Sequence, residues 1–198
     1  VKNDAPVSIS GGIIQNVDRG VFLNNFEGYN SNGSYGAHAT VSGVNITANS
    51  IGLYLHDHPS STHGAVKGNF TNNTITAPIG IQTEETTAGT TAGVFSTNTV
   101  NADSKGILIS GMSLSATNAL DISNNTVTMS TQLSGGAPSI GIQLSNLAGT
   151  AAATVLNNTV SGAHYGYSAY NVNTAPITSI NNGTISGVMQ GIAVLNTD

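Results

Sequence analysis

The chain has 198 residues, of which 7% are charged, and nine acidic residues against four basic ones give it a net charge of −5. The basic residues Lys2, Arg19, Lys67 and Lys105 form no cluster, so we expect no nucleic acid partner and no groove for polyanionic sugars. Cysteine is absent, and no run approaches the roughly twenty apolar residues of a transmembrane helix, so we expect no membrane insertion of this fragment.

In chain order, each period reads as a short apolar strand, an Asn-rich turn, a Thr-containing strand and a Gly-initiated strand. The apolar strand appears first as Val7-Ser-Ile-Ser10 and again as Leu120-Asp-Ile-Ser123. The Gly-initiated strands begin at Gly20, Gly52, Gly80, Gly106, Gly141, Gly166 and Gly191. The last three of these glycines are 25 residues apart, and such self-similarity is the signature of a repeat protein.

The Asn-rich turns lead directly into the Thr-containing strands. Asparagine tolerates left-handed backbone angles and can hydrogen-bond to the same residue one repeat away, which suits a sharp corner. We therefore expect one asparagine ladder, made of Asn73, Asn98, Asn125 and Asn158.

Three short strands per period, without any helical pattern, predict a chain that travels once around a prism and rises one strand spacing of about 4.8 Å. The predicted fold class is all-β: a right-handed parallel β-helix of about seven three-strand coils, forming a single domain over residues 1–198. Longer periods indicate loops at 24–36, 56–64, 84–93 and 130–138. Neither end carries an amphipathic cap, so we expect a longer native chain and coil edges that permit self-association.

Alternation along the Gly-initiated strands predicts two columns of inward side chains. The first is Val21, Leu53, Ile81, Ile107, Ile142, Tyr167 and Ile192. The second is Leu23, Leu55, Thr83, Ile109, Leu144, Ala169 and Val194.

The pattern Asn-Asn-Thr-Ile/Val followed by Gly-Ile-x-Leu resembles the right-handed parallel β-helix repeats of the pectin-lyase-like superfamily over nearly the whole chain. The low charge and the phrases Phe70-Thr-Asn-Asn73 and Phe95-Ser-Thr-Asn98 resemble bacterial autotransporter passengers and polymorphic outer-membrane adhesins. The companion Gly-Gly-Ala-Ile motif of those adhesins is represented by Gly11-Gly-Ile-Ile14. The resemblance implies an extracellular or bacterial cell-surface location, and a polysaccharide site across the Gly-initiated strands, as in the superfamily's enzymes.

The outward positions of these strands are therefore the candidate binding residues. The first predicted column is Phe22, Tyr54, Gln82, Leu108, Gln143, Ser168 and Ala193, and the second is Asn24, His56, Glu84, Ser110, Ser145, Tyr170 and Leu195. Exposed aromatic rings can stack on sugars or anchor a protein partner. Our first hypothesis is an extracellular surface adhesin or binding segment that engages a glycan or a host or matrix protein. Its predicted ligand-binding residues are Phe22, Asn24, Tyr54, His56, Gln82, Glu84 and Tyr170.

Acidic residues gather at the same end of this face, with His56, Glu27, His58 and His63 nearby. Asp57, Glu84 and Glu85 could hold a Ca²⁺ ion through carboxylate oxygens. They could also share acid and base duties across a sugar bond with help from His56, the basis of our second hypothesis, a polysaccharide lyase or glycoside hydrolase. The His56-Asp-His58 spacing could ligate zinc, or these residues could simply be solvated at a strand exit. Since no Arg or Lys stands in either column to stabilise developing charge, enzymatic activity is disfavoured but left open.

A third hypothesis comes from the Thr-containing strands, whose outward positions form matched rows. They are Asn45 and Thr47, Thr74 and Thr76, Thr99 and Asn101, Thr126 and Thr128, Thr159 and Ser161, and Thr184 and Ser186. These uncharged Thr-x-Thr rows resemble the ice-binding faces of β-solenoid antifreeze proteins. Thr also favours strands for structural reasons, and stacked Thr side chains stabilise neighbouring strands, so the rows have a structural explanation as well.

Overall fold

The computed structural model describes residues 7–24, 37–57, 66–85, 92–114, 120–131, 133–134, 136–170, 172, 177–181 and 183–195. Within these ranges all regular structure is β-strand and no helix occurs. Consequently no helix of the described residues is long and apolar enough to cross a membrane. Most of the predicted loops 24–36, 56–64 and 84–93, with Glu27, His58 and His63, lie outside the described residues.

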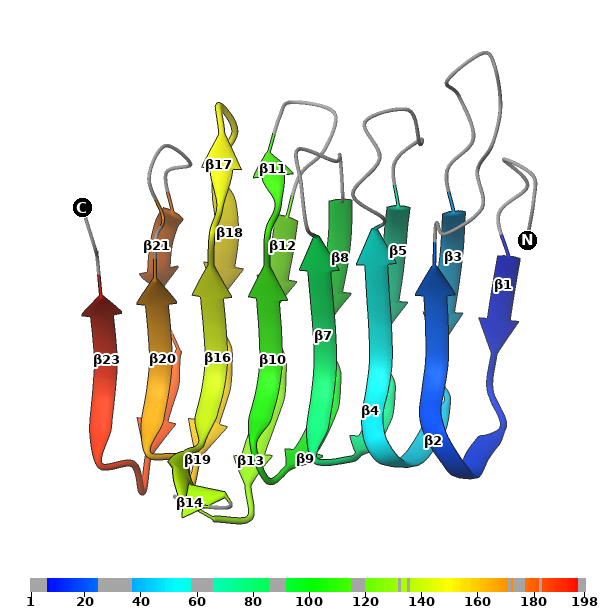
Figure 1. Ribbon diagram of the computed structural model, residues 1–198, viewed down its shortest axis with the longest axis horizontal. Coiled ribbons are helices and arrows are strands. Elements are labelled where there is room, and N and C mark those ends of the chain that lie inside the picture. The colour runs from blue at the N-terminus through cyan, green and yellow to red at the C-terminus, as the bar shows by residue number, and fades with distance from the viewer. Residues whose placement is uncertain are drawn as a thin grey trace.

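A seven-stranded sheet, here called the back sheet, contains one apolar strand from each coil (Figure 1). In spatial order its strands are β1 (Val7–Ser10), β3 (Ala37–Ser42), β5 (Val66–Thr71), β8 (Ala92–Ser96), β12 (Leu120–Ser123), β18 (Ala153–Leu156) and β21 (Ile177–Asn181).

A second sheet of 12 strands contains both the Gly-initiated and the Thr-containing strands. The Gly-initiated strands are β2 (Ile13–Asn24), β4 (Asn45–Asp57), β7 (Ile79–Glu85), β10 (Lys105–Ser110), β16 (Ile140–Ser145), β20 (Tyr165–Tyr170) and β23 (Gln190–Leu195). The separate Thr-containing strands are β6 (Thr74–Thr76), β9 (Thr99–Ala102), β13 (Thr126–Met129), β19 (Thr159–Ser161) and β22 (Thr184–Ser186), while β2 and β4 each span both segments. Two small pairs complete the described structure: β11 (Ser113–Leu114) with β17 (Ala148–Gly149), and β14 (Leu133–Ser134) with β15 (Ala137–Pro138) in the predicted loop 130–138.

Every strand pair in the two large sheets is parallel, and each strand pairs with its counterparts one coil away. In Figure 1 the chain runs up β2, β4 and β7 in front and down the back sheet while it advances from N to C, which is a right-handed path. The predicted all-β parallel solenoid is therefore confirmed. The structure forms about five turns, slightly fewer than the predicted seven.

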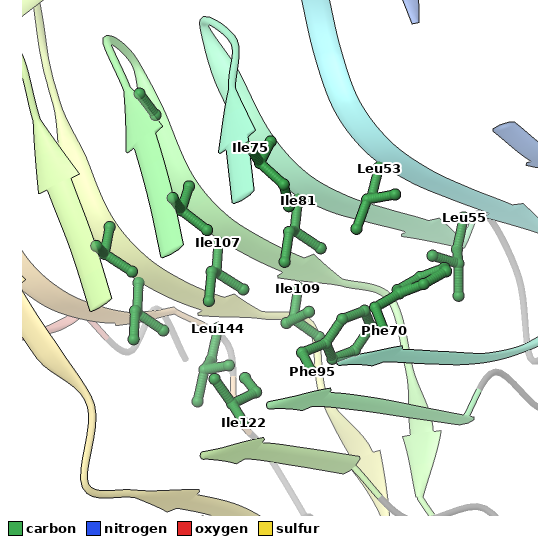
Figure 2. Close-up of a cluster of buried hydrophobic side chains, with 14 of the residues drawn as sticks. Leu53, Leu55, Phe70, Ile75, Ile81, Phe95, Ile107, Ile109, Ile122 and Leu144 are labelled. Carbon is green, nitrogen blue, oxygen red and sulfur yellow. The ribbon is translucent and has the colours of Figure 1, made fainter. Parts of the chain in front are cut away.

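The first predicted inward column is in register from Val21 to Ile192. In the second column Leu23, Leu55 and Thr83 pair in register, and so do Ile109, Leu144, Ala169 and Val194. Leu53, Ile81, Ile107 and Ile142 are fully buried, and Figure 2 shows these columns facing Phe70 and Phe95 of the back sheet. In the last row, however, Ile192 is 55% exposed and Val194 is 73% exposed, because no further described coil covers them.

The predicted asparagine ladder is also confirmed. Nδ2 of Asn73 donates to Oδ1 of Asn98 at 3.0 Å, Asn98 donates to Asn125 at 3.0 Å, and Asn125 donates to Asn158 at 2.9 Å. Each of these Oδ1 atoms also accepts the backbone N–H of the preceding ladder residue, at 2.9–3.0 Å. The expectation of left-handed angles at the ladder residues was wrong: the positive φ falls one residue earlier, at Asn72, Thr97, Asn124 and Asn157.

The ladder ends at an unusual row, where Gly183 occupies the ladder position opposite Asn158. The side chain of Asn158 instead hydrogen-bonds with Tyr167, the one aromatic member of the first inward column. The Tyr167 hydroxyl lies 3.2 Å from the point where a Cβ of Gly183 would sit. Burial raises the pKa of Tyr167 to about 12, so this phenol is neutral at physiological pH. Tyr167 thus replaces the missing asparagine.

Candidate functional site

The outer surface of β2, β4, β7, β10, β16, β20 and β23 is here called the Gly face. Both predicted outward columns run along it: Phe22 pairs with Tyr54 and then Gln82, and Asn24 pairs with His56 and then Glu84. The alignment continues to the C-terminal rows, where Ser168 pairs with Ala193 and Tyr170 with Leu195. The alignment of the first column is confirmed along its length, and that of the second within β2, β4 and β7 and within β10, β16, β20 and β23. Ser145 and Ser168, predicted to be outward, are buried. The role of both columns in binding stays a prediction.

Sequence reasoning missed a third column on this face, formed by the residue before each glycine. Its members in register are Arg19, Ile51, Ile79, Lys105, Ile140, Tyr165 and Gln190. The column includes Arg19 and Lys105, so the Gly face carries the cations that the two predicted columns lack. Lys105 is half-buried, and this burial lowers the pKa of its ammonium group. This column could have been found in the sequence by aligning the residues that precede the repeated glycines.

An aromatic stack occupies the N-terminal end of the Gly face. The rings of Phe22 and Tyr54 lie 5.0 Å apart between centroids, with an interplanar angle of 12°. The His56 ring is 5.8 Å from Tyr54 and 6.4 Å from Phe22. Phe22 and Tyr54 lie opposite each other on consecutive coils, one strand spacing apart, which is why their rings stack.

The guanidinium of Arg19 contacts both rings of this stack. Its central carbon Cζ is 4.9 Å from the Phe22 centroid and 5.1 Å from the Tyr54 centroid, within the range of cation–π attraction. Nearly equal distances to two stacked rings place the cation beside the stack. The face of Phe22 turned away from Tyr54 is therefore not covered by Arg19.

Tyr54 was predicted as an exposed aromatic, and this was wrong: it is 6% exposed, whereas Phe22 is 42% exposed. Its hydroxyl donates a hydrogen bond to Oε2 of Glu84 in the next coil. Burial is the larger cause and the contact with Glu84 the smaller one, and together they raise the pKa of Tyr54 above its ordinary value. The phenol therefore stays neutral and can donate its proton in this hydrogen bond. Tyr54 is thus the inner layer of the stack, and Phe22 is the layer that solvent reaches.

The remaining predicted binding residues are spread along the solenoid. Gln82 is half-buried next to Tyr54, and its Oε1 has no hydrogen-bond partner among the described residues. Tyr170 on β20 is half-buried and lies four rows from the His56 row, a separation of roughly 19 Å at the usual strand spacing. Phe22, Tyr54, His56, Gln82 and Glu84 therefore lie close together on neighbouring rows, whereas Tyr170 lies apart from them.

The predicted acidic cluster is supported by backbone register alone. His56 pairs with Glu84 and Asp57 pairs with Glu85 on β4 and β7. The side chains of Asn24, Asp57 and Glu85 fall outside what the structure describes. Among the described side chains, no group of three or more His, Cys, Asp or Glu residues could hold a metal ion. Calcium binding by Asp57, Glu84 and Glu85 stays a prediction.

A second regular surface, here called the Thr face, is the outer side of β6, β9, β13, β19, β22 and the first part of β4. Its predicted rows are in register throughout, as Thr74 with Thr99 and Thr99 with Thr126 illustrate. A depression of about 300 Å³ opens at one edge of this face, and Thr47, Thr76 and Asn101 of its second outward column line it. The lining residues are Thr47, Ala48, Asn49, Thr76, Ala77, Pro78, Asn101 and Asp103.

Comparisons of the chain with protein-family models, with curated proteins and with solved structures found no match. The two regular faces are therefore what points to a function.

Proposed function

We propose that this chain is an extracellular binding segment, displayed at a bacterial cell surface, that holds a glycan at the N-terminal end of its Gly face. The observation that carries this proposal is the stack of Phe22 on Tyr54 with Arg19 at its side. A host or matrix protein that inserts an apolar side chain against Phe22 is the alternative partner.

The chemistry of the stack suits a sugar ring. An exposed aromatic face attracts the C–H side of a pyranose, while neighbouring polar groups bind its hydroxyls. Phe22 offers such a face, since Tyr54 covers its other side and it remains 42% exposed. Arg19 supplies hydrogen-bond donors beside the ring, and its charge would also accept a sugar carboxylate.

The site is held rigid before any ligand arrives. Tyr54 is fixed from behind by its hydrogen bond to Glu84, and Phe22 is fixed by Tyr54 and Arg19. A binding surface that is already ordered loses less side-chain entropy when the ligand docks. This rigidity supports recognition by the folded solenoid itself.

The test is binding of the purified chain to a glycan and matrix-protein array, with calcium and with a chelator. We expect Phe22→Ala to weaken the binding at least about tenfold, as for an aromatic anchor at a recognition site. The matched control is Gln143→Ala, which lies in the same outward column four rows away and should bind as the wild type does.

Other results would favour a different site or a different activity. Binding that Phe22→Ala leaves unchanged would remove the stack as the site, and a chain that binds nothing on the array would count against the whole proposal. Loss of binding in the chelator would support the acidic cluster of Asp57, Glu84 and Glu85 as a calcium site. Cleavage of a bound sugar, abolished by Glu84→Gln, would instead favour the carbohydrate-active enzyme.

A further inference from the structure

The Thr face takes no part in the proposed glycan site, and its six rows are in register throughout. We propose that the Thr face is an ice-binding surface, whose aligned hydroxyl and methyl groups hold an ordered layer of water that joins the ice lattice.

The outward residues of the Thr face form a regular array. From β6 to β22 the rows stay in register without a shift, whereas the pair β2–β4 contains two shifts and the pair β18–β21 contains one. Outward groups therefore repeat every 4.8 Å or so along the solenoid and every 6.6 Å or so across it, from the ordinary strand spacing and rise. A two-dimensional lattice of water can match a surface only if the surface repeats in both directions.

Most outward side chains of the Thr face are exposed to solvent. In the four rows from β4 to β13 both outward residues are exposed, and the same is true of β22. The residues of β19, Thr159 and Ser161, are half-buried. Each exposed Thr hydroxyl can donate one hydrogen bond and accept two, and its methyl group lies beside it. The face thus presents polar and apolar groups in alternation to water.

The strands that carry the Thr face are held firmly in place. Between the two outward columns lies an inward residue, and Ile75, Val100, Val127 and Val160 are all completely buried. The asparagine ladder fixes one end of each of these strands. Thr is branched at Cβ and has few rotamers. The hydroxyl positions are therefore set before water orders on them, and little side-chain entropy remains to be lost.

The chemistry of the outward residues favours ice as the ligand of the Thr face. The twelve outward positions contain Thr, Ser and Asn but no charged residue, which matches a neutral lattice and leaves no ion that would keep its own hydration shell. They contain no Tyr, Trp or Arg, the residues that anchor most protein interfaces. They also contain no aromatic ring for a sugar to stack on. Ice is the occupant that this chemistry fits.

The experiment measures thermal hysteresis and inhibition of ice recrystallisation in the 198-residue chain. We expect activity in the wild type and its loss in Thr126→Tyr, because one bulky ring at the centre of the array prevents the flat contact. Gln190→Tyr is the matched control: it places the same ring on the Gly face, next to Tyr165, and should keep full activity. Unfolding curves of both variants establish that they are folded.

The result is separable from the glycan proposal. Phe22→Ala should leave thermal hysteresis unchanged, and Thr126→Tyr should leave glycan binding unchanged. Absence of hysteresis in the wild type would overturn the inference, and so would activity that a folded Thr126→Tyr retains. If the wild type lacks hysteresis and Thr126→Tyr loses binding on the array, the face binds a glycan or protein and ice is excluded.

Discussion

At the scale of single residues, the ladder asparagines satisfy polar groups that the corner would otherwise bury without partners. Asn125 shows the pattern: its Nδ2 donates to the carbonyl of Phe95 at 2.7 Å and to Asn158, and its Oδ1 accepts the N–H of Asn98. Its side chain is 1% exposed, so water cannot replace these bonds. Val41, Phe70 and Ile122 supply the corresponding carbonyl for Asn73, Asn98 and Asn158, so this contact depends on the backbone of the preceding coil.

This geometry predicts a large cost for Asn125→Ala. The change leaves the N–H of Asn98 and the carbonyl of Phe95 buried without partners, and we expect a loss of about 3 kcal/mol in the free energy of unfolding. Asn101→Ala is the control, because Asn101 is an exposed strand residue, and it should change stability by no more than about 0.5 kcal/mol. Urea denaturation measures both; equal effects would mean that the ladder contributes no special stability.

At the scale of elements, the glycine that opens each Gly-initiated strand lets consecutive coils approach closely. A Cβ on Gly106 would overlap both the Val127 side chain and the carbonyl oxygen of Gly141 in the next coil. The same two kinds of neighbour meet Gly20, Gly52, Gly80 and Gly141. The repeated glycine is therefore a steric requirement of the corner between the Thr-containing and Gly-initiated strands.

Two alanine substitutions in this one column test the requirement. We expect Gly106→Ala to lower the free energy of unfolding by about 2 kcal/mol, as overpacking does. A Cβ on Gly191, in the last row, meets no atom within 4 Å, so Gly191→Ala should be neutral or stabilise by up to about 1 kcal/mol through the unfolded chain. Thermal unfolding distinguishes the two; a Gly106→Ala protein as stable as the wild type would contradict the steric explanation.

At the scale of the whole molecule, each row depends mainly on the rows beside it. Stability in such a solenoid is close to a sum of row and interface contributions, so a row with one neighbour opens more readily than a row with two. Among the described residues, the C-terminal row of β21, β22 and β23 has one neighbouring row, and its apolar residues Met189, Ile192 and Val194 are all more than half exposed. The row of β9 and β10 lies inside the stack.

Hydrogen exchange should follow this order. We expect backbone amides of residues 99–110 to exchange at least about tenfold more slowly than those of 184–195, because the terminal row opens locally. Peptide-resolved mass spectrometry measures both segments in one sample. Protection of 184–195 that rises with protein concentration would support self-association through the coil edges, whereas equal protection at every concentration would contradict opening from the end.

The sequence by itself determined the solenoid, the stacking columns and the asparagine ladder. Each follows from a pattern that repeats along the chain, and in a parallel stack equal positions in the repeat become neighbours. The ladder of Asn73, Asn98, Asn125 and Asn158 could therefore be predicted residue by residue.

Only the tertiary structure decided what the Gly face contains. Strict alternation fails at the glycine, because its backbone fits between coils, so Arg19 two residues before Val21 faces outward while Val21 faces inward. Burial of Tyr54 likewise depends on Phe22 in the preceding coil and on Glu84 in the following coil. The sequence of a single repeat predicts neither the break in alternation nor the burial of one coil's side chains by the next coil. Both arise when the coils pack against each other.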